Sequence, residues 1–135
     1  MGNGTPTILD VGQCDPDHSQ IRRMLHDAVG ADVRRAHTID DALSQAKTTV
    51  FDLILVNRIL DRDGSEGLEL VRRLKADEAT SATPVMLVSN YADAQAAARA
   101  AGAVPGFGKN DVGSPVTREL IRATLGVETP QCDRQ

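Results

Sequence analysis

Short aliphatic runs alternate with helical segments along the chain, and this alternation constrains the fold more than any other feature. The strand-like runs lie at residues 7–11, 31–37, 51–56, 83–88 and 104–107. The helical segments lie at residues 16–29, 38–46, 66–76, 92–101 and 115–125. Strict alternation predicts an α/β protein, a three-layer sandwich in which a parallel sheet lies between helices, with right-handed crossovers.

Capping residues mark several of the helix ends. Gly30 and Gly126 each follow a helical segment, where a left-handed glycine commonly ends a helix. Thr38, with an acidic residue three positions later, and Ser114, followed by a proline, are typical of helix starts. With 135 residues, the chain fits one domain at residues 7–126, between tails at residues 1–6 and 127–135.

Charge and aromatic content exclude several classes of function. The formal net charge is −4, with no Trp, one Tyr and two Phe, so the chain lacks a basic field and aromatic platforms for nucleic acid. No apolar run approaches the roughly 20 residues that cross a bilayer, and the N-terminus has no signal-peptide pattern. We therefore expect a cytoplasmic protein that binds neither nucleic acid nor membrane.

Cysteine and histidine usage gives no indication of a metal site or a disulfide. Cys14 and Cys132 are too few for a zinc cluster, and the last helix should carry Cys132 away from Cys14, so reduced thiols are expected. The histidines fall on separate elements or faces: His18, His26 and His37. No grouping of serine, histidine and aspartate has a nucleophile-elbow setting, and no enzymatic activity is predicted.

Polar loops follow the strands at the edge where α/β proteins place their chemistry. In parallel sheets, ligands bind outside the carboxyl ends of the strands. Those ends correspond here to residues 12–17, 57–63, 89–93 and 108–111. Asp10 is a carboxylate inside an otherwise apolar strand, so it is expected to have a structural partner, with a displaced metal or phosphate site as the alternative.

Taken in order, these segments resemble the receiver domain of two-component response regulators, a family with the CheY-like, flavodoxin-like fold. The best local matches are residues 15–17, 51–56, 67–74 and 83–89, followed by Lys109. The resemblance covers residues 7–125. It implies a five-stranded parallel sheet in the order 2-1-3-4-5, with helices on both faces.

The resemblance also locates the functional positions of the family, and several have lost their usual residue. Receivers normally carry two acidic residues after the first strand, which hold Mg²⁺, and the matching positions here are Gln13 and Cys14. The phosphoacceptor aspartate corresponds to Asn57. The two residues that contact the phosphoryl group correspond to Ser89 and Lys109.

A further departure concerns the aromatic residue that couples the site to the output face of receivers. That position, three residues before the lysine, is Gly106, and Phe107 lies one place along. The resemblance therefore implies no aromatic switch of the usual kind. Residues 105–108 lack the context of a phosphate-binding loop and are interpreted as a loop and strand edge.

The substituted residues are poorly suited to phosphotransfer on chemical grounds alone. Mg²⁺ prefers carboxylates and water, so an amide and a thiol attract it little and its binding should be weak or absent. An amide oxygen is a poor nucleophile, so we predict no acyl phosphate at Asn57 and no cofactor. A Lys109 ammonium at this site would need a carboxylate, which Asp10, Asp15 or Asp61 is expected to supply.

The leading hypothesis is a stand-alone, degenerate receiver, or pseudo-receiver, that acts through phosphorylation-independent protein–protein interaction. Its partner would be a histidine kinase or an effector, and the face at residues 92–125 is a candidate docking and homodimer surface. One alternative is a phosphorylatable regulator in which Asn57 replaces the acceptor aspartate. Another is a small-molecule or redox sensor that uses the pocket around Cys14, Asn57, Ser89 and Lys109.

Overall fold

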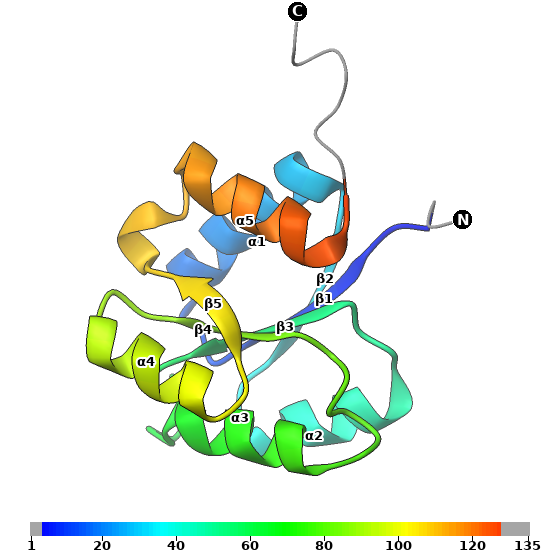
Figure 1. Ribbon diagram of the computed structural model, residues 1–135, viewed down its shortest axis with the longest axis vertical. Coiled ribbons are helices and arrows are strands. Elements are labelled where there is room, and N and C mark those ends of the chain that lie inside the picture. The colour runs from blue at the N-terminus through cyan, green and yellow to red at the C-terminus, as the bar shows by residue number, and fades with distance from the viewer. Residues whose placement is uncertain (1–3, 128–135) are drawn as a thin grey trace, which may run out of the picture.

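The computed structural model describes residues 4–127, in which a central sheet has helices on both faces (Figure 1). The strands are β1 (Thr7–Val11), β2 (Asp32–Ala36), β3 (Leu53–Asn57), β4 (Val85–Val88) and β5 (Val104–Phe107). The helices are α1 (Asp15–Val29), α2 (Ile39–Thr48), α3 (Gly67–Ala76), α4 (Ala92–Ala100) and α5 (Pro115–Leu125), with a 3-10 turn η1 (Lys109–Asp111) before α5. All strand pairs are parallel, and the order β2-β1-β3-β4-β5 confirms the predicted topology.

The two faces of the sheet are covered by different helices. Figure 1 shows α1 and α5 together on one face, with α2, α3 and α4 on the other. Alternate residues of β3 belong to the two halves of the core. Leu55 lies in the same cluster as Leu25 of α1, whereas Ile54 lies in the same cluster as Leu70 of α3. Since both of its faces are buried, β3 is apolar almost throughout, as the sequence indicated.

The predicted caps close the helices. Gly30 and Gly126 follow α1 and α5 with φ of 65° and 72°, so each is a left-handed residue that ends a helix. At the start of α2, Thr38 Oγ1 accepts a hydrogen bond from the Asp41 amide at 3.1 Å. Ser114 Oγ accepts a hydrogen bond from the Val116 amide in the same way before α5.

Over residues 4–127, no helix combines the length and the apolar character that crossing a bilayer requires.

The third strand begins later than its aliphatic run suggests and ends one residue further on. Asp52 still belongs to the turn: its amide donates to the Thr7 carbonyl and its carboxylate accepts the Thr7 amide, both at 2.8 Å. The regular ladder with β1 then starts at Leu53. Asn57 is consequently the last residue of the strand rather than the first residue of the loop.

Candidate functional site

Three of the residues singled out by the sequence meet at the carboxyl ends of the strands. Asn57 ends β3, Ser89 follows β4 and Lys109 follows β5, and all three line a pocket of about 330 Å³. Arg58 and Tyr91 lie on its rim, with the Arg58 guanidinium carbon 4.9 Å from the centre of the Tyr91 ring. The parallel topology therefore assembles this pocket from residues more than 50 positions apart in sequence.

Asn57 is buried and its side chain is committed to the main chain. Its Nδ2 donates hydrogen bonds to the carbonyl oxygens of Gly12, at 2.9 Å, and of Ile59, at 2.8 Å. Gly12 has φ of 79°, a left-handed conformation that favours glycine. Both partners are acceptors, so only a donor group can satisfy them, which a carboxylate is not.

Lys109 is neutralised by a carboxylate that the sequence analysis did not single out. Its Nζ lies 2.9 Å from Oδ2 of Asp17, in the first turn of α1. The hydrogen bond from the Lys109 ammonium lowers the pKa of Asp17 below its ordinary value. The expectation that Asp10, Asp15 or Asp61 supplies this charge was wrong, because each of these carboxylates lies beside a different basic side chain.

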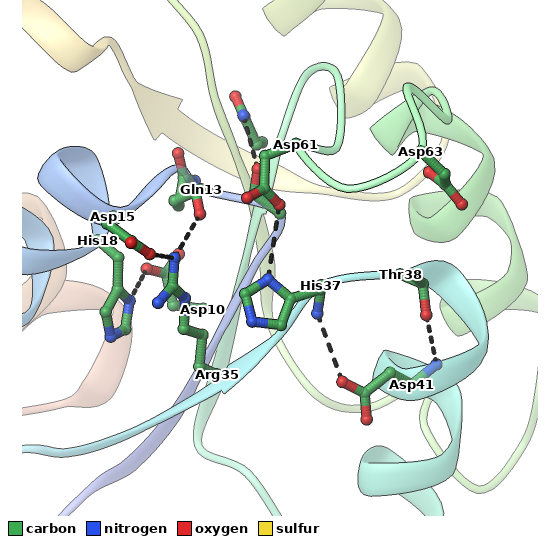
Figure 2. A network of polar contacts seen from close by, with 12 residues as sticks. Asp10, Gln13, Asp15, His18, Arg35, His37, Thr38, Asp41, Asp61 and Asp63 are labelled. Carbon is green, nitrogen blue, oxygen red and sulfur yellow. Dashed lines mark hydrogen bonds and ion pairs between the residues drawn. The ribbon is translucent and has the colours of Figure 1, made fainter.

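Asp10 forms a buried pair with His18. Its side chain is 0% exposed, and Oδ2 lies 2.6 Å from Nδ1 of His18 (Figure 2). Burial raises the pKa of Asp10, while the hydrogen bond to His18 opposes that rise. The carboxylate in the apolar strand therefore has a structural partner, and this pair joins β1 to α1. Across residues 4–127, no three His, Cys, Asp or Glu side chains gather closely enough to hold a metal ion.

Asp15 and Asp61, the other two carboxylates expected near Lys109, lie beside Arg35 of β2 and His37, the residue that follows β2 (Figure 2). Arg35 Nη2 donates to Asp15 Oδ1 at 2.7 Å and to the Gln13 carbonyl oxygen at 2.9 Å. The hydrogen bond and positive charge of Arg35 lower the pKa of Asp15. Asp61 lies 3.6 Å from Nδ1 of His37, measured from Oδ1. Asp15 and Asp61 thus lie beside basic side chains other than Lys109.

Gln13 and Cys14, at the positions expected to carry acids, have different surroundings. The Gln13 side chain is buried, at 1% exposure. Cys14 is exposed and precedes α1 as its N-cap residue, and it does not line the pocket around Asn57. The expected pocket that included Cys14 was therefore wrong in this respect. Cys132 lies outside the described residues.

Gly106 lies in β5 where the chain passes close to β4. A Cβ atom there would lie 2.2 Å from the Leu87 carbonyl oxygen, so only glycine fits. Phe107, the next residue, is buried in the core below α1 and α5. Gln95 of α4 reaches this junction and donates to the Leu87 and Ser89 carbonyl oxygens.

Sequence reasoning missed Asp17, Gln95 and the stacked Arg58 and Tyr91. The sequence places Asp17 as an acidic residue in the first turn of the first helix, but it does not predict which way the side chain points. Gln95 had a stronger signal, because it is the sole uncharged polar side chain within the alanine run of its helix. Such a residue, partly buried beside alanines, indicates a hydrogen-bonding role.

Comparisons with known proteins agree with the architecture. The family model described as "Response regulator receiver domain" matches residues 15–106. The signal receiver domain of a DNA-binding response regulator from Colwellia psychrerythraea is similar, with TM-score 0.76 and 20% identity, covering 90% of this chain and 98% of that one. The chemotaxis response regulator CheY4 of Vibrio cholerae is also similar, with TM-score 0.69 and 20% identity, covering 85% of this chain and 98% of that one.

A third similar structure is the phosphorylated cyanobacterial phytochrome response regulator RcpA, with TM-score 0.73 and 18% identity over 93% of this chain and 98% of that one. No curated protein matches the chain. At these identities, the structural likenesses establish the fold alone.

Proposed function

The chain belongs to the response regulator receiver domain family of two-component signalling, and we propose that it is a pseudo-receiver whose output does not depend on phosphorylation. The observation that carries this proposal is the Asn57 side chain. It ends β3, where a receiver would present its acceptor carboxylate, and it donates to the Gly12 and Ile59 carbonyl oxygens. An amide in this arrangement is a structural group and a poor nucleophile.

The surroundings of the pocket support a site without Mg²⁺. Its lining contains no carboxylate: Asn57, Arg58, Ile59, Val88, Ser89, Asn90, Tyr91 and Lys109. Asp17, which pairs with Lys109 at 2.9 Å, is not among the lining residues. Because Mg²⁺ is held through carboxylate and water oxygens, these residues do not fit it, and no step of the proposed function passes through a metal.

The proposed activity is docking of a signalling protein, a histidine kinase or an effector, in the cytoplasm, without catalysis by this chain. The face formed by α4, β5 and α5 supports this proposal. Ala96, Ala97 and Ala100 are exposed on α4, and Val116 of α5 is 77% exposed. Small exposed side chains allow close approach of a partner helix, because the distance between packed helix axes depends on the side chains at the contact. Sedimentation of the purified chain tests the alternative, which is docking of a second copy on this face.

Intact mass spectrometry after incubation with acetyl phosphate and Mg²⁺ tests the proposal. The natural chain should carry no phosphoryl adduct. The matched positive control is the triple variant Gln13→Asp, Cys14→Asp, Asn57→Asp, which restores the carboxylates and should gain an adduct that Asn57→Asp alone gains poorly. An adduct on the natural chain would overturn the proposal and favour the alternative of a phosphorylatable regulator.

The pocket itself favours a second candidate function, the sensing of a small anion. Its volume of about 330 Å³ and the Arg58 guanidinium suit a small carboxylate or phosphate, which Lys109 would bind in exchange for its Asp17 partner. Tyr91 is the sole tyrosine in a chain without tryptophan, and it lines both this pocket and a neighbouring cavity, whereas Lys109 lines only this pocket of the two. Saturable quenching of the Tyr91 fluorescence by inorganic phosphate that Lys109→Ala abolishes would support sensing. An unchanged signal would contradict it.

A further inference from the structure

The side-chain amide of Gln95 joins α4 to the ends of two strands. Its Nε2 donates to the Leu87 carbonyl oxygen at 2.9 Å and to the Ser89 carbonyl oxygen at 3.1 Å. The Phe107 carbonyl oxygen of β5 is a third, longer partner at 3.4 Å. We call this set of contacts, Gln95 with the carbonyl oxygens of Leu87, Ser89 and Phe107, the Gln95 clamp.

The clamp occupies the place where the sheet comes closest to α4. The register between β4 and β5 shifts between Met86 and Val88. A Cβ atom on Gly106 would lie 2.2 Å from the Leu87 carbonyl oxygen and 2.9 Å from Oε1 of Gln95. Gly106 therefore leaves room for the amide, and a larger residue in β5 would displace it.

The clamp adds polar contacts to a helix that buries few of its side chains. Ala98 is the sole fully buried residue among the nine of this helix, and most of the others are alanine. An alanine buries little apolar surface, so packing alone holds the helix weakly. Hydrogen bonds from a partly buried amide are costly to break without replacement partners, and Gln95 supplies two short ones.

The clamp also contacts the pocket wall. Ser89 lines the pocket, and its carbonyl oxygen is one of the acceptors of Gln95. The Ser89 amide donates to the Phe107 carbonyl oxygen at 3.0 Å, which ties β4 to β5 at the same point. A movement of Ser89 relative to α4 would break bonds on both sides of this junction.

We propose that the Gln95 clamp fixes α4 against β4 and β5 in one arrangement, so that the docking face keeps its shape whatever the state of the pocket. This inference rests on the proposed function and adds its regulation: the face is permanently competent to bind. A partner protein would meet the same surface on α4, β5 and α5 at all times. In this proposal α4 does not change position between two states, because the hydrogen bonds of Gln95 hold it in one.

Hydrogen exchange of the α4 amides, measured by mass spectrometry on the full chain, tests the clamp. Gln95→Met keeps the length of the side chain and removes the donor, and Gln95→Glu removes the donor at nearly constant shape. Both variants should speed exchange of residues 92–100 by about tenfold. Two variants are used so that a folding failure in one leaves the other, with far-UV circular dichroism as the check of folding.

The matched control is Gln45→Met on α2. Gln45 Nε2 donates to the Arg35 carbonyl oxygen at 2.9 Å and to Asp41 Oδ1 at 3.2 Å, so it is also an amide that ties a helix to a strand. This variant should speed exchange in α2 and leave α4 unchanged. Natural α4 exchange rates in a folded Gln95→Met variant would overturn the clamp.

Repeating the exchange with acetyl phosphate and Mg²⁺ separates this inference from the proposed function. The clamp predicts slow α4 exchange in the natural chain with and without these reagents. A phosphoryl adduct on a chain whose α4 stays slow would overturn the pseudo-receiver and support the clamp. Fast α4 exchange in an unmodified natural chain, equal to that of Gln95→Met, would overturn the clamp and leave the proposed function standing.

Discussion

Nδ2 of Asn57 lies 2.9 Å from the main-chain carbonyl oxygen of Gly12, so a side chain at the end of β3 bonds the turn that follows β1. The same carbonyl oxygen accepts the Asp61 amide at 3.0 Å. Asn57 also bonds the Ile59 carbonyl oxygen, which holds the loop after its own strand. The side-chain amide of Asn57 therefore connects two of the loops at the carboxyl ends of the strands, the loop after β1 and the loop after β3.

Replacing this amide by a carboxylate should destabilise the protein. Asn57→Asp places an anionic acceptor against two carbonyl oxygens, and the expected loss in free energy of unfolding is about 2 kcal/mol. Urea unfolding at neutral pH measures it. Asn90→Asp is the matched control: Asn90 Oδ1 accepts the Asn110 amide, which a carboxylate also accepts, so its stability should stay near that of the natural chain. Equal stability of both variants would contradict the structural role of Asn57.

The pair between Asp17 and Lys109 should give stability that acid removes. Because the hydrogen bond from Lys109 lowers the pKa of Asp17, its contribution is present above the ordinary value of 3.8 and is lost as the pH falls through the lowered value. Asp17→Asn should cost about 0.5 kcal/mol at neutral pH, since the pair is partly exposed. Urea unfolding across an acid series measures this cost, which should vanish at the lowest pH. A cost that is the same at every pH would rule out the ion pair as its cause.

Asp10 should show the opposite pH dependence. Burial raises its pKa above 3.8, so its contribution to stability is full below that value and is lost as the pH rises through the raised pKa. Asp10→Asn removes this titration. The unfolding free energy of the variant, measured relative to the natural chain, should therefore improve as the pH rises from about 4. A difference that moves the other way would mean that His18 outweighs burial.

The contact between β4 and β5 predicts that Gly106 tolerates no side chain. Gly106→Ala would bring Cβ within 2.2 Å of the Leu87 carbonyl oxygen and against Gln95, and the expected loss is about 2 kcal/mol in free energy of unfolding. Gly113→Ala is the control, because a Cβ there meets nothing within 4 Å. Thermal unfolding compares the two variants. A Gly106→Ala variant as stable as the control would contradict the close approach.

The layers and the order of elements were predictable from local patterns. The cap at Gly30 and the start at Ser114 follow from backbone geometry that few residues adopt, and the apolar run of β3 follows from burial on both faces. The meeting of Asn57 with Lys109 was predictable too, because parallel strands end at one edge.

The partners of individual side chains were not predictable in the same way. The pairing of Lys109 with Asp17, and the reach of Gln95 from α4 to β4, depend on rotamers and on packing between elements. Several acidic residues lie near the carboxyl ends of the strands, and the sequence pattern does not indicate which of them pairs with Lys109. The sequence indicated which residues gather at the site. Which side chains pair with each other could be seen only in the structure.

Amide-resolved NMR spectra of the natural chain, recorded before and after addition of Mg²⁺ and acetyl phosphate, test the central claim most directly. A receiver that does not depend on phosphorylation should keep the same chemical shifts at Asn57, Ser89 and Lys109 and throughout α4. Saturating shift changes at those three residues that spread into residues 92–100 would contradict the account, because the site would then take the metal or the phosphoryl group and pass the change to the docking face.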